Sequence, residues 1–318
     1  MMNAFALALV LFAISAPAVF AAIEDDFQAW GLEHKKTYHG KEAYTYRLGV
    51  YARNAAFVEK HNEKGESWEV ALNEFADLTY EEFEASYLTD RFNVTESSAG
   101  FSARTVVNVD WKAHGYVTPI RKQNCGDCYS FAATAAMEAC HKGSSGQLLD
   151  LSEQQCLDCS LGFGNMGCSG GWADNCWSYY ASVGGQDSEA SYPYTGAQGP
   201  CQQAGITPVA AVTGGSAVMT TEAALQQSVV SRVTAAAMDA SGSAFQLYKT
   251  GTYCPTTCST TQLNHAVTVI GQQTSSPDYY IVKNSWGTTW GMLGYFRICA
   301  NRSNKCGIAS HASYPVGC

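Results

Sequence analysis

Apolar and polar positions divide the start of the chain into one long apolar run followed by amphipathic stretches. Residues 1–21 are almost continuously apolar, with small residues near the end of the run. Val19, Phe20 and Ala21 fit the small-residue rule for signal-peptide cleavage, so we expect a cut after Ala21. The run is also about long enough to span a membrane. No basic cluster flanks it, which favours a cleaved signal peptide over an anchor.

Residues 23–87 contain no cysteine and show helical periodicity. A first amphipathic helix is marked by Phe27, Trp30 and Leu32. A second helix is predicted over residues 42–61, because polar and apolar side chains recur there at three- and four-residue steps. The positions on this face are Arg47, Tyr51, Asn54, Val58 and Asn62.

A strand, a third helix and a polar stretch are predicted next. Residues 68–72 have a strand-like pattern, and Thr79 with Glu82 makes a capping box that begins a helix. Residues 88–102 are rich in Ser, Thr and Asn and lack periodicity, so we expect a linker. Acceptor sequences for N-glycosylation occur at Asn93 and Asn301.

Cys128 ends a short run of turn-prone residues and is followed by helix-forming ones. It is therefore predicted to lie in the first turn of a helix, where unpaired N–H groups and the positive end of the dipole meet. Both favour an anion, so we expect the thiol to ionise more easily than a free one and to act as a nucleophile. Asp127 directly precedes it and is predicted to cap the same helix.

Two other uses of this cysteine fit the local pattern. The spacing Cys125-x-x-Cys128 is also typical of a thioredoxin-like redox pair. Together with Cys156-x-x-Cys159 it is typical of a zinc site. The spacing alone does not separate these two alternatives from catalysis.

Composition and charge narrow the function classes. The chain has 318 residues, of which 46% are hydrophobic, so it can bury a sizeable core and hold more than one unit. Residues 1–104 carry 9 basic and 16 acidic side chains, a net charge of −7, and residues 105–318 carry 10 and 12, a net charge of −2. Because no basic patch is present, we expect no nucleic-acid partner.

The 13 cysteines all lie at or after Cys125. Many cysteines in a chain that enters the secretory route predict disulfides. Since the number is odd, at least one thiol stays unpaired within the chain.

Further polar residues adjoin the predicted strands of the C-terminal half. His265 begins an apolar strand, and Asn284 follows a strand over residues 279–283. His265 lies 137 residues after Cys128 (265 − 128), within the spacing expected of a Cys-His peptidase. A glycine-rich loop covers residues 167–171.

These motifs resemble the papain-like cysteine peptidases. The run Cys125-Gly126-Asp127-Cys128-Tyr129 is similar to the family signature Cys-Gly-Ser/Ala-Cys-Trp/Tyr, with Asp127 as a departure. The helix over residues 42–61 and the run Asn73-x-Phe75-x-Asp77 resemble the two motifs of the inhibitory prosegment of cathepsin L-like enzymes. In three further departures, Gln123 lies five rather than six residues before Cys128, Tyr129 replaces the commoner Trp, and Asn264 replaces Asp.

The resemblance implies a chemistry for these residues. Cys128 and His265 would form a thiolate–imidazolium pair, with Asn284 orienting the imidazole. Trp286 would shield the bond between His265 and Asn284 from water. Gln123 and the N–H of Cys128 would be the donors that hold the oxyanion.

The resemblance also implies substrate-binding residues. Gly170 and Gly171 would pair with the substrate backbone, and Asn264 is a further substrate-binding candidate. The pocket for the side chain two residues before the scissile bond would be formed by Trp172, Ala173, Ala237 and Leu263, with His311 at its base. We expect a hydrophobic side chain there. Near pH 5 a protonated His311 is expected to accept a substrate Asp or Glu as well.

By resemblance, three disulfides are Cys125–Cys168, Cys159–Cys201 and Cys258–Cys306. The connectivity of the other cysteines stays open; they are Cys140, Cys156, Cys176, Cys254, Cys299 and Cys318. Because the family's C-terminal tail crosses back to the first lobe, Cys318 is a candidate to pair there.

We therefore expect an α+β, papain-like two-lobed fold, with a helical lobe and an antiparallel β-barrel-like lobe, preceded by a mostly helical inhibitory prodomain. The expected division is a signal peptide over residues 1–21, a propeptide over 22–104 and a peptidase domain over 105–318. The expected activity is that of a cysteine endopeptidase made as a zymogen, with processing near residues 103–106.

The expected substrates are proteins and peptides, and the chain's own propeptide is the expected inhibitor, with cystatin-like inhibitors as further candidates. We expect a monomer in the lysosome, an acidic vacuole or the extracellular space, without cofactor, metal or membrane attachment after signal cleavage. Two rival classes are an inactive papain-like binding protein and a thiol–disulfide exchange protein. Retention of Cys128, His265 and Asn284 argues against the first, and the absence of a thioredoxin-like βαβ pattern argues against the second.

Overall fold

The computed structural model describes residues 16–95 and 107–318. Most of the predicted signal peptide (residues 1–15) and the predicted processing region (residues 103–106) lie outside the described residues. The predicted cut after Ala21 falls within the first helix, α1 (Ala16–Glu33), and stays a prediction. Within the described ranges, no helix has the length and apolarity needed to cross a bilayer.

The N-terminal segment is mostly helical, as the periodicity predicts. After α1 follow α2 (Lys41–Asn62), β1 (Trp68–Val70) and α3 (Tyr80–Tyr87). The capping box of α3 is present, because the Thr79 side chain accepts from the Glu82 N–H and the Glu82 carboxylate accepts from the Thr79 N–H.

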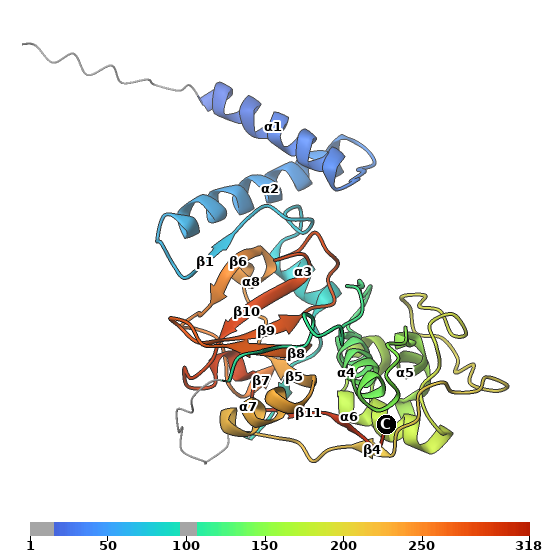
Figure 1. The fold of residues 1–318 in the computed structure, drawn as a ribbon. Coiled ribbons are helices and arrows are strands. Elements are labelled where there is room, and N and C mark those ends of the chain that lie inside the picture. Colours follow the sequence, from blue (N-terminus) through green and yellow to red (C-terminus); the bar gives the residue numbers. More distant parts are fainter. Residues whose placement is uncertain (1–15, 96–106) are drawn as a thin grey trace, which may run out of the picture.

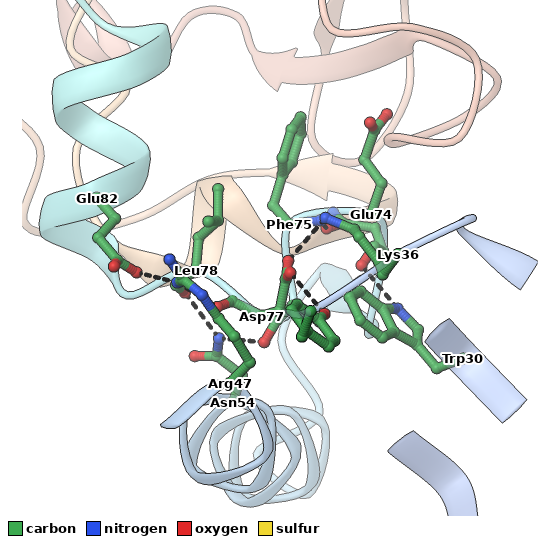
Figure 2. Close-up of polar contacts among 12 residues, drawn as sticks. Trp30, Lys36, Arg47, Asn54, Glu74, Phe75, Asp77, Leu78 and Glu82 are labelled. Atoms are coloured by element: carbon green, nitrogen blue, oxygen red, sulfur yellow. Dashed lines mark hydrogen bonds and ion pairs between the residues drawn. The ribbon is translucent and has the colours of Figure 1, made fainter. Parts of the chain in front are cut away.

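One face of α2 holds the turn between β1 and α3 by hydrogen bonds to its carbonyls. Figure 2 shows Arg47 and Asn54 pointing from the helix toward this turn. The Asn54 amide donates to the carbonyls of Ala76 and Leu78, at 2.8 and 3.0 Å. Arg47 donates to the Asp77 carbonyl and pairs with the Glu82 carboxylate at 2.6 Å. The spacing of polar residues on α2 therefore serves to shape a loop that would otherwise bury unpaired carbonyls.

The rest of the chain forms two lobes, which lie side by side in Figure 1. The helical lobe contains α4 (Cys128–Ser145), α5 (Glu153–Cys159), α6 (Ala173–Val183) and the short 3₁₀ helices η1 (Leu161–Phe163) and η2 (Gly167–Ser169). α4 is rich in alanine, and residues 128–139 of it are all buried. A helix that is apolar on all sides has to lie in the interior of the protein.

The second lobe is built on a sheet with the strand order β1-β6-β10-β9-β8-β5-β11, and β3 pairs with β8. Its strands are β3 (Val109–Asp110), β5 (Thr234–Met238), β6 (Tyr248–Tyr253), β8 (His265–Gln273), β9 (Tyr279–Lys283), β10 (Tyr295–Cys299) and β11 (Ala312–Ser313). All pairs are antiparallel except β10 with β6.

Helical elements and short strand pairs complete this lobe and its edges. The helical elements are α7 (Glu222–Ser231), α8 (Ser243–Gln246) and η3 (Lys305–Gly307). The short pairs are β12 (Pro315–Val316) with β4 (Gly214–Gly215) and β2 (Phe92–Asn93) with β7 (Gln262–Leu263).

The N-terminal segment shares the sheet and the core of the second lobe. Strand β1 extends the sheet at its edge by pairing with β6. Aromatic residues of the segment belong to the same hydrophobic core as those of the sheet lobe. Phe83 and Phe75 contact Trp286 edge-on, at centroid distances of 5.0 and 6.2 Å. Docking of the segment is therefore part of the folding of this core rather than a surface contact.

Six disulfides use all cysteines except Cys128. Three join the pairs implied by resemblance: Cys125–Cys168, Cys159–Cys201 and Cys258–Cys306. The other three are Cys140–Cys318, Cys156–Cys176 and Cys254–Cys299. Cys318 thus ties the C-terminus back to α4. Because Cys125, Cys156 and Cys159 are in disulfides, none of them is available as a zinc thiolate or as a redox partner of Cys128.

Candidate active site

Cys128 is the first residue of α4 and is 1% exposed. The backbone N–H of Ala266, the second residue of β8, donates to its sulfur at 3.2 Å. The predicted capping role of Asp127 is wrong, because the Asp127 side chain makes no hydrogen bond to the helix. Its φ and ψ of −104° and 23° differ from the extended conformation that a capping side chain requires. It accepts a hydrogen bond from the Tyr194 hydroxyl instead, at 2.8 Å.

His265 begins β8 and lines the same pocket as Cys128. Its Nε2 lies 2.8 Å from Oδ1 of Asn284, which directly follows β9. The imidazole stacks on Trp286, with ring centroids 4.5 Å apart. Its Nδ1 is buried and has no hydrogen-bond partner within residues 16–95 and 107–318. One ring nitrogen is therefore held by Asn284 and the other is left for a reacting group.

Burial keeps both of these groups uncharged in the intact chain. It raises the pKa of the Cys128 thiol to about 12. It also lowers the pKa of His265 to about 4, although the bond to Asn284 acts in the opposite direction. The expectation that the thiol ionises more easily than a free one is therefore wrong for the intact chain. The cost of removing water from the Cys128 thiolate is larger than the stabilisation that the N-terminus of α4 gives to it.

Cys128 and His265 are covered by part of the stretch predicted to be a linker without regular structure. For residues 89–95 this prediction is wrong, because they are held by backbone hydrogen bonds and include a strand. Strand β2 pairs antiparallel with β7, and the N–H of Thr89 donates to the Asn264 carbonyl at 2.9 Å. Thr89 and Phe92 line the pocket of Cys128 and His265. The stretch is ordered by backbone bonds to a strand edge, which do not require hydrophobic periodicity.

Gln123 is fully buried near this pocket despite its shorter spacing to Cys128. Its Oε1 accepts a hydrogen bond from the Ser285 hydroxyl at 2.5 Å. Its Nε2 donates to the carbonyls of Cys125 and of Tyr87, at 2.7 and 3.1 Å. The amide nitrogen is thus shared between a carbonyl next to the start of α4 and a carbonyl of the N-terminal segment.

The predicted substrate-binding residues gather around Phe92 of that segment. Gly171, Trp172, Ala237 and Leu263 line the pocket, and the Phe92 ring lies 4.8 Å from the Trp172 ring.

Two other predicted residues contact the segment itself. At Gly170 a Cβ would lie 2.8 Å from the Thr89 Cβ, and its φ of 122° is strained for other residues. The Asn264 carbonyl accepts from Thr89, whereas its side chain accepts from the Ala240 N–H and donates to Ser241. Ala173 begins α6 and does not line the pocket.

His311 is near the pocket but has a partner that the sequence analysis missed. Its ring stacks on Trp172 at 3.8 Å, and its Nε2 lies 3.1 Å from Oδ1 of Asp174. Asp174 lies 137 residues before His311 (311 − 174), so no local pattern indicates the pair. Ser285 and Tyr194 were missed for the same reason, because both bond to residues far away in the sequence.

Comparison with known proteins agrees with this geometry. Residues 105–316 match the family described as "Papain family cysteine protease", and residues 27–83 match "Cathepsin propeptide inhibitor domain (I29)". The chain belongs to the papain family of cysteine proteases. It is a cathepsin L-like zymogen, and the N-terminal segment is its inhibitory propeptide.

Similar papain-family proteins cover almost the whole chain. Digestive cysteine proteinase 3 of Homarus americanus is 40% identical over 89% of this chain and 94% of its own length. The cathepsin L-like proteinase of Fasciola hepatica is 37% identical over 97% of this chain and 98% of its own. The structure of digestive procathepsin L 3 from Tenebrio molitor larval midgut superimposes with a TM-score of 0.83 at 34% identity, covering 93% of this chain and 99% of that one.

The burial of Cys128 predicts slow thiol chemistry in the intact zymogen. We expect iodoacetamide at pH 7 to label the zymogen at least about a hundredfold more slowly than the processed enzyme, because both access and thiolate formation are suppressed. Phe92→Ala should speed labelling of the zymogen, whereas Leu32→Ala, at an exposed site on α1, should not. Cys128→Ser measures background labelling. Equal rates in zymogen and processed enzyme would contradict the prediction.

Proposed function

We propose that the processed enzyme hydrolyses peptide bonds through Cys128, His265 and Asn284. The observation that carries this proposal is that the single free thiol shares a pocket with an imidazole whose Nε2 is bonded to Asn284. In the free cleft the thiol proton moves to His265 Nδ1, which gives a thiolate and an imidazolium. Asn284 holds the ring in the orientation that presents Nδ1 to the sulfur.

The reaction follows from these positions. The Cys128 sulfur attacks the scissile carbonyl carbon, and the C–N bond breaks as His265 gives its proton to the leaving amine. A water molecule, deprotonated by His265, then attacks the thioester and releases the acid. The Gln123 amide and the Cys128 N–H hold the developing oxyanion. In support of this role, the Gln123 amide donates to a carbonyl of the propeptide, that of Tyr87, in the zymogen.

We infer that the enzyme is an endopeptidase that binds a hydrophobic side chain two residues before the scissile bond. Support comes from the propeptide itself, which presents Phe92 to a pocket lined by Trp172, Ala237 and Leu263. The backbone pairing of residues 92–93 with β7, flanked by the bonds of Thr89 to Asn264 and of Val94 to Thr261, suggests how an extended peptide would be held. Proteins and peptides are the proposed substrates.

We further propose entry into the secretory route after a cut at Ala21, with activity in a lysosome, an acidic vacuole or outside the cell. Six disulfides support an oxidising compartment during folding. The boundary between propeptide and peptidase near residue 104, a monomeric state and inhibition by cystatin-like proteins remain proposals. Glycosylation at Asn93, which is exposed, and at Asn301, whose amide donates to Asp278, also remains a prediction.

The proposed function is tested with dipeptidyl fluorogenic substrates on enzyme whose propeptide has been removed at acidic pH by immobilised wild-type enzyme, so that inactive variants are processed as well. We expect Cys128→Ser and His265→Ala to abolish hydrolysis, and Gln123→Ala to lower kcat by about a hundredfold or more, as for loss of one oxyanion donor. A thiol-alkylating epoxide should inhibit the wild type completely. Gln147→Ala, at an exposed position of the peptidase domain, serves as the matched control. Substantial hydrolysis by Cys128→Ser would refute the proposal.

Asp174 should keep the pocket selective for hydrophobic side chains at all pH values. A positive charge on His311 is balanced by the adjacent carboxylate, so the wild type should prefer Leu to Glu at pH 5 and at pH 7. In Asp174→Asn no carboxylate balances such a charge. We expect the ratio of kcat/KM for Glu to that for Leu to rise by about tenfold at pH 5.

The double variant Asp174→Asn/His311→Ala should lose this rise. An acid-dependent rise in the wild type would favour His311 alone as the acceptor of acidic side chains. No rise in Asp174→Asn would mean that the pair does not control the pocket.

Glu82 should make propeptide release sensitive to acid. Burial acts to raise the pKa of Glu82, but hydrogen bonds from Arg47 and from the Thr79 N–H outweigh it and lower the pKa below its ordinary value. Since folding favours the ionised form, this stabilisation is present above the unfolded pKa and is lost as pH falls through the folded one. We therefore expect self-processing near residues 103–106 at acidic pH and little at neutral pH.

Glu82→Gln keeps the capping bond but removes the charge, so it should process faster at pH 6 and show a smaller difference between pH 4 and pH 6. The measurement is the rate at which the shortened chain accumulates, with Cys128→Ala as the control without self-cleavage. Unchanged pH dependence in Glu82→Gln would exclude this carboxylate as an acid sensor.

A further inference from the structure

Asp127, directly before the nucleophile, is a carboxylic acid in the interior of the enzyme. Its side chain is 0% exposed. Oδ2 accepts a hydrogen bond from the Tyr194 hydroxyl at 2.8 Å, and Oδ1 is buried and receives no hydrogen bond from any described residue. No Lys, Arg or His of residues 16–95 and 107–318 forms an ion pair with it. A carboxylate buried with one bonded oxygen and no counter-charge is unfavourable compared with the neutral acid.

The titratable groups around Asp127 do not compensate its charge. Cys128 and Tyr129 face it from α4, and Tyr194 faces it from the loop after α6. Glu153 of α5 acts on Tyr194 in turn. Tyr194 is itself bonded, because its N–H donates to Glu189 and its hydroxyl accepts from the Asn124 N–H. None of these neighbouring groups carries a positive charge that would compensate an ionised Asp127.

Burial raises the pKa of Asp127 to about 7, although bonds from Tyr194 and from nearby backbone groups act to lower it. The charge of Asp127, when present, raises the pKa of Cys128 in addition to the effect of burial. The side chain that bonds to Asp127 belongs to the peptidase domain, so this hydrogen bond does not depend on the propeptide.

We propose that Asp127 is a positioning residue for the charge of the nucleophile, and that its ionisation sets the upper pH limit of activity. The inference rests on the proposed role of Cys128. While Asp127 holds its proton, the thiolate forms beside a neutral acid. When the proton leaves to solvent as pH rises, an anion stands next to Cys128 and disfavours the thiolate by Coulomb repulsion. The enzyme is thereby restricted to acidic and neutral pH, which suits a protease released from its zymogen by acid.

The test uses processed wild type, Asp127→Asn and Tyr194→Phe. The readouts are the pH profile of kcat/KM from pH 4 to pH 9 and the rate of alkylation of Cys128 by a neutral reagent. Asparagine has the shape of aspartate but does not ionise. We expect kcat/KM of Asp127→Asn to match that of the wild type at pH 5 within about threefold. The alkaline limb of the profile, where kcat/KM falls with rising pH, should move up by about one pH unit. Cys128 should be alkylated about tenfold faster than in the wild type at pH 8.

Tyr194→Phe removes the hydroxyl that donates to Oδ2, so Asp127 should hold its proton to higher pH and the alkaline limb should move up by a smaller amount. This variant keeps the proposal testable if Asp127→Asn does not fold. Asp150→Asn, an exposed acid of the same lobe, controls for the loss of one negative charge and should leave the limb in place.

A second readout is stability in a Cys128→Ser background. Because the folded pKa of Asp127 is raised, the unfolded chain releases its proton first, and wild-type stability falls between the unfolded and folded pKa values, from about pH 4 to pH 7. The Tm advantage of Asp127→Asn should therefore grow over this window.

Identical alkaline limbs and alkylation profiles in wild type, Asp127→Asn and Tyr194→Phe would overturn the inference. An equal loss of activity at every pH would overturn it too, because it would indicate a merely structural role. Activity in Cys128→Ser would instead refute the proposed function, so the two failures are distinguishable.

Discussion

The packing of α4 against β8 is the contact on which the site depends. α4 begins at Cys128 and β8 begins at His265. Alanines of α4 and Ile270 of β8 belong to one core, and Ala266 packs against it. Small side chains let the helix approach the sheet closely, and the result is a backbone N–H of β8 at 3.2 Å from the Cys128 sulfur. Cys128 and His265 are each the first residue of one of these elements, so the packing of α4 against β8 sets the relative position of the two side chains.

Trp286 links this site to the propeptide. The same indole stacks on His265 and receives the rings of Phe83 and Phe75. The propeptide therefore completes a core that also supports the imidazole, and strand β1 adds to the sheet of that core. In the zymogen the propeptide therefore packs against the residues that support the site as well as covering Cys128. Any change that unfolds the helices of the propeptide also removes the cover over Cys128, since α3 leads directly into residues 89–94.

Burial affects three ionisable groups of the site in different ways. For Cys128 and His265 part of the cover is the propeptide, through Thr89 and Phe92, so its departure lets water return to both. For Asp127 the bonded side chain is Tyr194 of the peptidase domain. Water that returns to the cleft therefore relieves the first two groups and leaves the third in place. Asp127, which departs from the family signature, is thus a buried acid directly before Cys128 whose bond to Tyr194 does not involve the propeptide.

The sequence by itself determined features that depend on neighbours in the chain. The capping box of Thr79 and Glu82 and the polar face of α2 are local patterns, and both are present in the structure. Resemblance supplied Cys128, His265 and Asn284 and three disulfides, because those motifs are contiguous. Only the tertiary structure decided the other disulfides, the partner of His311, the bond of Asp127 to Tyr194, and the strand formed by residues 92–93. These contacts join residues far apart in the chain, and their stability comes from burial and strand-edge pairing, which leave no periodic pattern in the sequence.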